Sequence, residues 1–543
     1  MVALFTFGEL EIGVLTLIFL LPVLAAFPTW LIGRVRNDFS KYFALIISSI
    51  VMLLAILAWM MFENNFLLPT SLHADRTLLA TGGWSLTEDI AWIASIGMNY
   101  SLGVDGLSLP LVMLGGFIFV VAILASFNDI NEREPAYYAM ILLLETGVIG
   151  TFVATDFIVF FVAWELVLVP MFFLIGIWGG PKREYAAIYF FIYTHVASLF
   201  LLLGIIGMWL QTATTDAMVL TGLSSGTFSF QQMTYLAQNL IGGFGTELPV
   251  LLIFLALLFG FIVKVPSVPF HTWLPLAHVE APTPGSMILA GLLLKMGGYG
   301  IMRMSGWFLP EALSEFAWLL AIIGLVSLLY GSWVALRQVD MKSLVAYSSV
   351  GHMGIILLGV ATQTEAGFAA AMYMQIAHGI ISPLMFFVAG TIGHSANTRD
   401  IPKLKGIAKQ MPITAAVLVF GSFASAGLPG LAGFWSELLA FIALFSMTAI
   451  MTIPVINLTI TGSAIAVIGA LGIIFTAAYY LWMLQRTVFG DVNPELKHAH
   501  DVSHLPQYLT LGLLCLFTVL LGLFPAFLID LMSTASGFFA SMF

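Results

Sequence analysis

The sequence has little charge and almost no cysteine. Asp, Glu, Lys and Arg make up 8% of its 543 residues, whereas hydrophobic residues make up 60%. Soluble domains carry about 25% charged residues, so this composition excludes an ordinary soluble protein and indicates an integral membrane protein. The single cysteine, Cys515, lies in an apolar run, which excludes a disulfide framework and a cysteine metal site.

The sequence also lacks the motifs that bind redox and nucleotide cofactors. It has no glycine-rich phosphate loop, no cysteine cluster and no haem-attachment motif. We therefore expect no cofactor in this chain, and we expect no nucleic-acid partner. The N-terminus has acidic Glu9 and Glu11 where a signal peptide has basic residues, so we expect the first helix to be retained.

Long apolar runs dominate what remains. A membrane-spanning helix needs about 20 mostly apolar residues, and windows of this length predict an all-α membrane protein of about 14 transmembrane helices. The windows are 12–33, 42–62, 107–127, 136–154, 156–178, 186–210, 248–269, 285–304, 314–336, 343–361, 366–391, 412–448, 460–483 and 507–533. The window 412–448 is too long for one straight span and contains Pro429, so it is either one broken helix or two spans.

The basic residues decide between these alternatives. With 14 spans, the loops after the odd-numbered helices hold 14 of the 18 Lys and Arg residues. The other loops hold only Arg76 and Arg303, and Lys264 and Lys295 lie within helices. The positive-inside rule predicts such an asymmetry, and a fifteenth span would spoil it. We therefore predict that helix 12 is broken and that both termini face away from the cytoplasm.

Eight of the predicted helices carry one ionisable side chain near mid-depth. In helices 4 to 8 and 10 to 12 these are Glu145, Glu165, His195, Lys264, Lys295, His352, His378 and Glu437. A charge at the centre of a membrane helix costs about 2.5–3.5 kcal/mol, and packing has no need of one. We interpret the line as an ion pathway. Glu, Lys and His all exchange protons, and histidine relays them through either ring nitrogen, so protons are the expected ion.

Each of these residues also has a simpler interpretation. A buried Glu–Lys pair can merely fix the register of two helices, and a lone histidine such as His195 can be a hydrogen-bonded packing residue. Glu145 can bond to a neighbouring helix. Eight such residues in consecutive or nearly consecutive helices favour the pathway. Because unpaired charges at this depth are costly, we expect Glu165 and Lys264 to be in contact or one water apart.

Two helix breaks suggest an internal repeat. Lys264 is followed by Pro266 and Pro269, so helix 7 should break there, and helix 12 should break at Pro429. The breaks are five helices apart, an offset that inverts the topology, as in inverted-repeat transporters. We predict inverted repeats of helices 4–8 and 9–13. The chain then divides into N-terminal helices (1–135), two repeats (136–304 and 305–490) and a C-terminal loop and helix (491–543).

Two further polar segments are candidates for metal sites. His271, His278 and Glu280 lie in a polar loop predicted after helix 7, but their spacing matches no standard metal site. We interpret this loop as a turn or as a gate for proton uptake, with His271 as an accessory residue. A second set of candidates, with a solvated loop as the default interpretation, is His498, His500, Asp501 and His504. We expect no metal in either segment.

Seven short motifs are more specific. They are Gly103 to Ser108 (GVDGLS), Trp164 to Leu166 (WEL), Val263 to Pro266 (VKVP), His271 to Pro275 (HTWLP), Ala277 to Thr283 (AHVEAPT), Leu294 to Gly300 (LKMGGYG) and Gly433 to Glu437 (GFWSE). Together they resemble the antiporter-like membrane subunits of respiratory complex I, most closely the M type of bacteria or subunit 4 of mitochondria. The resemblance covers most of the chain.

This resemblance implies roles for four residues. Glu165 and Lys264 would form the central pair, Lys295 would continue the path, and Glu437 would be the exit-side site. Glu145 matches no motif of the family. The implied function is proton translocation coupled to redox chemistry in other subunits of a complex I-like NADH/quinone-type oxidoreductase.

The resemblance also implies partners and a location. Other membrane-arm subunits and the lipid bilayer would surround the chain, and a peripheral electron-transfer arm would act on it indirectly. The plasma membrane of a prokaryote is the expected location, with the thylakoid membrane as the alternative. Related subunits occur in multi-subunit Na⁺/proton antiporters and membrane-bound hydrogenases, and these stay open as alternatives. A purely structural scaffold is disfavoured by the buried charges.

Overall fold

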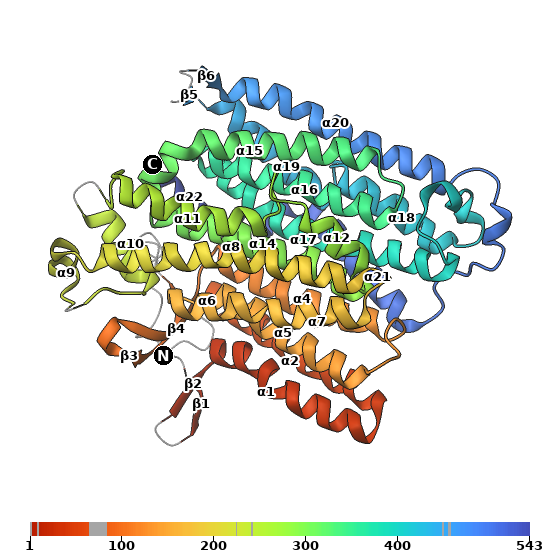
Figure 1. Ribbon diagram of the computed structural model, residues 1–543, viewed down its shortest axis with the longest axis horizontal. Coiled ribbons are helices and arrows are strands. Elements are labelled where there is room, and N and C mark those ends of the chain that lie inside the picture. The colour runs from red at the N-terminus through yellow and green to blue at the C-terminus, as the bar shows by residue number, and fades with distance from the viewer. Residues whose placement is uncertain are drawn as a thin grey trace.

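A computed structural model describes residues 3–7, 10–64, 84–223, 225–240, 243–447, 450–453 and 458–543. It is a bundle of long helices lying side by side (Figure 1). Within these residues, twelve helices are long and apolar enough to cross a membrane. The predicted all-α membrane fold is thus confirmed, whereas the count of 14 spans and the inverted repeats stay predictions.

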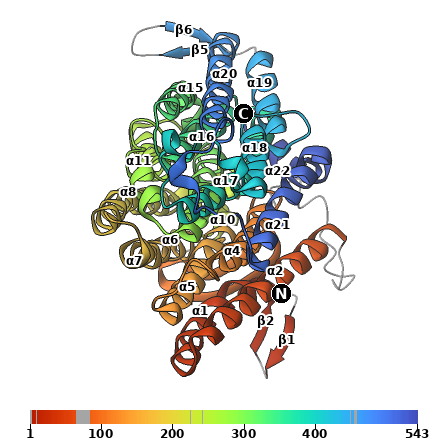
Figure 2. The ribbon, with the colours of Figure 1, turned by 90° about the vertical axis from the view of Figure 1, so that its right-hand side faces the viewer.

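The spanning segments follow the predicted windows closely, because apolar length alone sets them. They are α1 (Val14–Val35), α2 (Asn37–Asn64), α4 (Ser108–Ser126), α5 (Glu134–Val153), α6 with α7 (Phe157–Leu166, Leu168–Trp178), α8 (Arg183–Thr212), α13 through η4 (Thr283–Ile288, Leu289–Leu293, Leu294–Gly300, Ile301–Trp307), α15 (Pro310–Leu336), α16 (Met341–Ala361), α17 (Glu365–Ala396), α20 (Gly462–Thr487) and α21 (Leu505–Leu523). In the view of Figure 2, α17 lies in the middle of the bundle, with α1 and α20 at opposite edges.

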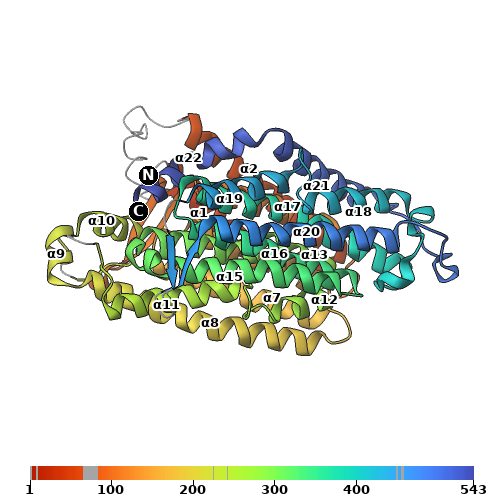
Figure 3. The same cartoon turned by 90° about the horizontal axis from the view of Figure 1, so that it is seen from above.

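The two ends of the bundle differ. The three hairpins β1–β2 (Ala3–Phe7, Leu10–Gly13), β3–β4 (Ser85–Ile93, Met98–Val104) and β5–β6 (Ile450–Ile453, Leu458–Thr461) lie at the end that also holds α9 (Thr215–Thr221), α10 (Phe230–Asn239) and both termini (Figures 1 and 3). The opposite end holds the short turns η5 (Ile401–Leu404), η6 (Ile407–Lys409) and η7 (Pro494–Leu496) and most of the basic loops. By the positive-inside rule we predict that this second end is cytoplasmic.

Helix 12 is one broken span. It consists of α18 (Pro412–Ser425) and α19 (Ala432–Ser446), each about 22 Å long, which is too short to cross a hydrocarbon core of about 30 Å. Gly427 and Gly430, with φ of +74° and +90°, turn the chain between the two halves. The predicted break at Pro429 is therefore correct.

Helix 7 is also broken, but the predicted polar loop after it is wrong. α11 (Leu248–Lys264) ends at the lysine, as expected from the prolines that follow. The chain then forms a second helix, α12 (Trp273–Glu280), which is mostly buried within the bundle. His271, His278 and Glu280 are consequently buried rather than displayed in a loop.

Two other predictions need correction. The window 507–533 joins two helices, because Pro525 has no backbone N–H and starts a new helix, α22 (Pro525–Ser541), after α21. Arg303, which was predicted in a non-cytoplasmic loop, lies inside the bundle in the π-helical segment η4. Hydropathy ends the window at residue 304, and a charged residue near such an end is easily taken for a loop residue.

Candidate functional site

The centre of the site is a contact between helices 8 and 11. Nζ of Lys295, on α14, lies 2.7 Å from Nδ1 of His378, on α17. The same ammonium donates to the carbonyl of Ala290, which lies in the π-helical segment η3. π-Helical segments are rare and concentrate at functional sites. Both side chains are buried, so the contact is enclosed at mid-depth.

From His378 the buried titratable residues continue to helix 12 through an edge-to-face contact of two histidine rings. The rings of His378 and His352, on α16, lie 5.4 Å apart between centroids. Nε2 of His352 is 3.0 Å from the carbonyl oxygen of Ser425, the last residue of α18. The hydroxyl of Ser425 donates to that of Tyr480 (2.8 Å), which donates to Ser348 (3.1 Å). The break in helix 12 therefore presents a carbonyl to the histidines.

Glu437 lies on the other side of this break. It is buried on α19, and a Cβ placed on Gly427 would lie 2.2 Å from its Oε2. The carboxylate is thus held against the turn that separates the two half-helices. The structure thus brings Lys295, His378 and His352 together beside the break of helix 12, and Glu437 lies against the turn of the same break.

The first half of the predicted line is arranged differently. Oε2 of Glu165 is 3.0 Å from Nδ1 of His195, and no ion pair joins Glu165 to Lys264 in the part of the chain that is described. Of the two arrangements predicted for Glu165 and Lys264, the direct ion pair is absent from the described residues, and the arrangement with one intervening water stays a prediction. The reason is the direction of the side chains. Glu165 and His195 lie at the periphery, with side chains 24% and 42% exposed, whereas Lys264 is enclosed.

Lys264 is instead held by an aromatic ring. Its ammonium lies 5.1 Å from the centroid of Trp164, whose indole N–H donates to Ser198 (3.1 Å). Among the described residues, Nζ of Lys264 has no hydrogen-bond partner. A buried, unpaired ammonium is costly, and packing alone does not require one at this position.

The glycines of the LKMGGYG motif bring the two lysine helices together. A Cβ on Gly297 would lie 2.8 Å from the carbonyl oxygen of Phe261, and one on Gly300 would lie 2.3 Å from the Phe261 ring. α14 therefore packs against α11 at a distance that only glycine permits. This explains the small residues beside Lys295.

Comparison with known proteins identifies the family of the chain. The transmembrane family described as NADH:quinone oxidoreductase/Mrp antiporter matches residues 154–465. The chain belongs to this family. It is 41% identical over 458 residues to F(420)H(2) dehydrogenase subunit M of Methanosarcina mazei, which covers 83% of this chain and 86% of the relative. It is 37% identical over 511 residues to NAD(P)H-quinone oxidoreductase chain 4 of Synechococcus elongatus, which covers 94% of this chain and 88% of the relative.

A solved structure supports the same assignment. A chain of respiratory complex I from Thermus thermophilus superposes with a TM-score of 0.79 and 25% identity, over 97% of this chain and 99% of that one. The protein is thus an integral, multi-pass, antiporter-like membrane subunit of the M type, as the motifs indicate.

Glu145 of this antiporter-like subunit lies apart from the line. Its Oε2 is 2.5 Å from the hydroxyl of Ser48 on α2, and its Oε1 has no hydrogen-bond partner among the described residues. Gly147, two residues further on and so on the opposite face of α5, packs against Val167 beside the Glu165 helix. Depth alone placed Glu145 in the line, but its side chain points toward helix 2.

His278 is a residue of this subunit for which the spacing alone suggested only a turn, a gate or a metal. Both of its ring nitrogens are buried without a hydrogen-bond partner among the residues described, and the ring stacks on Phe386 at 4.2 Å. His271 is buried too, with its ring 5.2 Å from Tyr330 and 6.0 Å from Tyr347. Two sequence signals could have indicated that this segment is buried. One is the AHVEAPT motif, and the other is the pair of prolines that breaks helix 7 before it.

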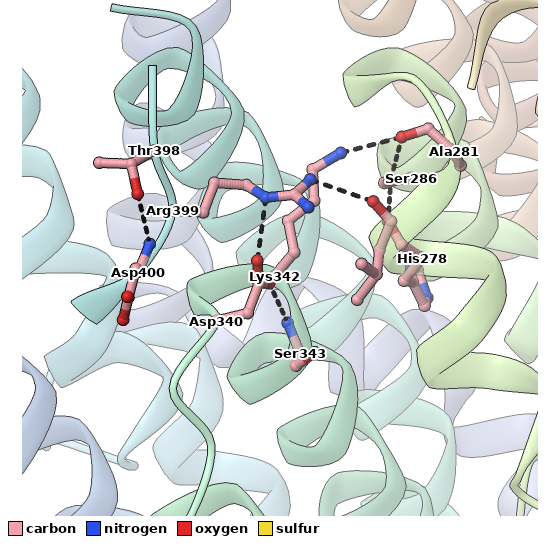
Figure 4. A network of polar contacts seen from close by, with 10 residues as sticks. His278, Ala281, Ser286, Asp340, Lys342, Ser343, Thr398, Arg399 and Asp400 are labelled. Carbon is pink, nitrogen blue, oxygen red and sulfur yellow. Dashed lines mark hydrogen bonds and ion pairs between the residues drawn. The ribbon is translucent and has the colours of Figure 1, made fainter. Parts of the chain in front are cut away.

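The cytoplasmic end of α12 is fastened to the second half of the subunit. Nζ of Lys342 donates to the carbonyl of Ala281 (2.9 Å), and Nη1 of Arg399 donates to that of Val279 (3.0 Å). Figure 4 shows both cations reaching the end of α12 beside His278. A cavity of about 680 Å³ opens here, and its lining includes Asp129, Glu280, Lys342, His394 and Arg399.

The second candidate metal segment, which contains Asp501, caps the N-terminus of α18. Both carboxylate oxygens of Asp501 accept from the backbone at the start of α18, from Ile413 N (2.6 Å) and Thr414 N (3.1 Å), and one also accepts from the Thr414 hydroxyl (2.5 Å). Within the described ranges, no three His, Cys, Asp or Glu side chains converge as metal ligands do.

Proposed function

We propose that this subunit moves protons along a mid-membrane line of Glu165, Lys264, Lys295, His378, His352 and Glu437. The observation that carries the proposal is the enclosed contact of Lys295 with His378, with His352 beside it at the break of helix 12. The ammonium and the two imidazoles are groups that take up and release protons, and the Ser425 carbonyl would orient the His352 ring.

The two broken helices give the line access to the two surfaces. The cavity at the end of α12 is lined by Val279 and Glu280, which directly follow the buried His278, so uptake from the cytoplasmic side is expected there. The break between α18 and α19 lies beside Glu437, so release to the other side is expected near that carboxylate. The proton then travels parallel to the membrane plane between the two openings.

We further propose that the chain is a membrane-arm subunit of a complex I-like translocase of the NADH:quinone oxidoreductase type (EC 7.1.1.-). The named relatives are subunits of an F(420)H(2) dehydrogenase and of an NAD(P)H-quinone oxidoreductase, so the electron donor differs between relatives and is set by other subunits. This chain would hold no redox cofactor. Its location would be the plasma membrane of a prokaryote, and other membrane-arm subunits and the lipid bilayer would surround it.

Purification of the native complex tests this assignment. Electron-transfer subunits should copurify with the chain, and the complex in vesicles should move protons in sodium-free medium when its electron donor is added. A complex without redox subunits, whose proton movement requires sodium, would instead identify a cation/proton antiporter. A copurifying hydrogenase subunit would instead identify the complex as a membrane-bound hydrogenase.

A further inference from the structure

A buried ion pair lies near the non-cytoplasmic end of helix 8, away from the line. Nη2 of Arg303 donates to both carboxylate oxygens of Asp105, at 2.7 and 2.8 Å. Asp105 also accepts from the backbone N–H groups of Leu107 and Ser108, at 3.1 and 2.9 Å, at the start of α4. Arg303 is fully buried, and Asp105 is 5% exposed. The carboxylate is therefore anchored by one guanidinium nitrogen and two backbone N–H groups, while Nη1 of Arg303 has no hydrogen-bond partner among the described residues.

Aromatic rings close around the guanidinium. Its central carbon lies 3.7 Å from the ring centroid of Trp307, 4.2 Å from that of Trp84 and 5.3 Å from that of Tyr299. Trp307 is covered in turn by Phe538 of α22, at 5.4 Å. The C-terminal helix thus covers the aromatic rings that surround the guanidinium.

Buried polar side chains lie between this pair and the centre of the line. Lys295, Tyr299 and Arg303 follow one another at intervals of four residues, and Nε of Arg303 lies 3.4 Å from the Tyr299 hydroxyl. Gln375, one turn before His378 on α17, is buried against Gly298, and its Oε1 has no hydrogen-bond partner among the described residues. Buried polar groups therefore run from the Lys295–His378 contact toward the non-cytoplasmic end.

We infer that the Arg303–Asp105 pair is a plug that closes this branch and prevents Lys295 from losing protons to the non-cytoplasmic surface. The inference rests on the proposed proton translocation. A guanidinium is not deprotonated in proteins, so it cannot relay a proton, and its fixed positive charge repels protonated water. The carboxylate of Asp105 is occupied by Arg303 and two backbone N–H groups. The pair therefore insulates the line at a point where its polar side chains would otherwise reach the surface.

The test is the passive proton leak of the assembled complex in vesicles, measured with an imposed pH gradient and no electron donor. Arg303→Gln leaves Asp105 buried without its cation, able to take up and pass on a proton, so the leak should rise several-fold. The double variant Arg303→Gln/Asp105→Asn has no titratable group there, so its leak should fall back to that of the wild type. A merely structural pair predicts a double variant at least as leaky as the single one.

Two further variants test whether the proton leak runs through Lys295 and is specific to the loss of Arg303. Adding Lys295→Met to Arg303→Gln should also remove the leak if the branch joins the line. Arg486→Gln is the matched control, because Arg486 also lies over a tryptophan, Trp482 at 5.8 Å, but at the cytoplasmic end. It should leak no more than the wild type.

A wild-type leak in assembled Arg303→Gln overturns the plug. If that variant does not assemble, Arg303→Lys decides, because lysine keeps the ion pair but can release its proton: a raised leak supports the plug and an unchanged leak overturns it. Donor-driven pumping and its dependence on Lys264 are measured on the same vesicles. Pumping that depends on Lys264 without a leak in Arg303→Gln refutes the plug alone, whereas pumping that does not depend on Lys264 refutes the proposed pathway.

Discussion

The carboxylate of Glu165 is paired with His195, and Lys264 lies over Trp164 without an anionic partner in the described part of the chain. Glu165 therefore has two basic neighbours of different character, a half-exposed imidazole on α8 and an enclosed ammonium on α11. If the Glu165 carboxylate alternates between His195 and Lys264, its pairing with His195 sets how long Lys264 stays unpaired.

His195→Phe keeps a ring that packs against Phe191 but removes the hydrogen-bond partner of Glu165. We expect donor-driven pumping to slow several-fold; a wild-type rate would make His195 a packing residue.

Lys264→Met should abolish pumping while the complex remains assembled. Methionine keeps the apolar length of the side chain beside Trp164 and removes the only group there that carries a proton. The measurement is donor-driven acidification in vesicles, with subunit content checked on the same preparation. Lys497→Met, in the cytoplasmic loop before α21, is the control and should pump normally. Normal pumping by Lys264→Met would rule out this residue as an obligatory carrier.

Loss of His352 or His378 should slow pumping less than loss of Lys264 or Glu437. Water can occupy the space of an imidazole and relay a proton, but it cannot replace a fixed charge. Single apolar variants of the two histidines, compared with Lys264→Met and Glu437→Gln, provide the test. Inactive histidine variants beside normally pumping Lys264→Met and Glu437→Gln would show that the proposed line is wrong.

Gly427→Ala should impair pumping more than Gly430→Ala. Both glycines have positive φ, so alanine costs about 1–2 kcal/mol of backbone strain at either position. Only at position 427 would the new Cβ also displace the carboxylate of Glu437, because the nearest atom to a Cβ at position 430 is 4.0 Å away. Thermal stability should fall similarly in both variants. Equal pumping rates would show that the position of Glu437 at the break does not matter.

Asp156, in the non-cytoplasmic turn between α5 and α6, should make stability depend on pH. Burial raises the pKa of this carboxyl from 3.8 to about 6, although it accepts hydrogen bonds from the backbone of Asn99, Ile158 and Val159. Between these pH values the folded state binds more protons than the unfolded state, so the free energy of unfolding falls as pH rises, by about 3 kcal/mol in all.

Asp156→Asn should remove this dependence. The Tm in detergent at pH 4.5 and at pH 7 should differ less in the variant than in the wild type. Asp216→Asn, on exposed α9, is the control and should keep the wild-type difference. An unchanged pH dependence in Asp156→Asn would assign the effect to another group.

The sequence predicted what depends on position along a helix. Apolar length fixed the spans, the Pro429 turn fixed the break in helix 12, and mid-span location selected Lys295, His352 and His378, which the structure brings together. It did not predict what depends on rotation about the helix axis. Glu165 pairs with His195 at the periphery, and Glu145 points to helix 2. Hydropathy could not predict these directions, because it reports the depth of a residue and not the face of the helix on which it lies.

Residues beyond the helix breaks were also misplaced by the sequence. A break was taken as the end of burial, so His278 was assigned to a loop, whereas α12 continues inside the bundle. Arg303 was assigned to a loop for a related reason, since its partner Asp105 is nearly 200 residues away and no local pattern connects them. Pairings over such separations are set by tertiary packing.

The attachment of α12 has a mechanical consequence. Lys342 and Arg399, from the second half of the chain, hold two carbonyl groups at the last turn of a helix that belongs to the first half. Tilting α12 outward would break both hydrogen bonds at once, and although Arg399 would keep its ion pair with Asp340 (3.0 Å), both carbonyl groups would lose their cationic donors. Hydration of the break in helix 7 is therefore easier to achieve by rotating single side chains, such as His278 against Phe386, than by swinging the half-helix as a lever.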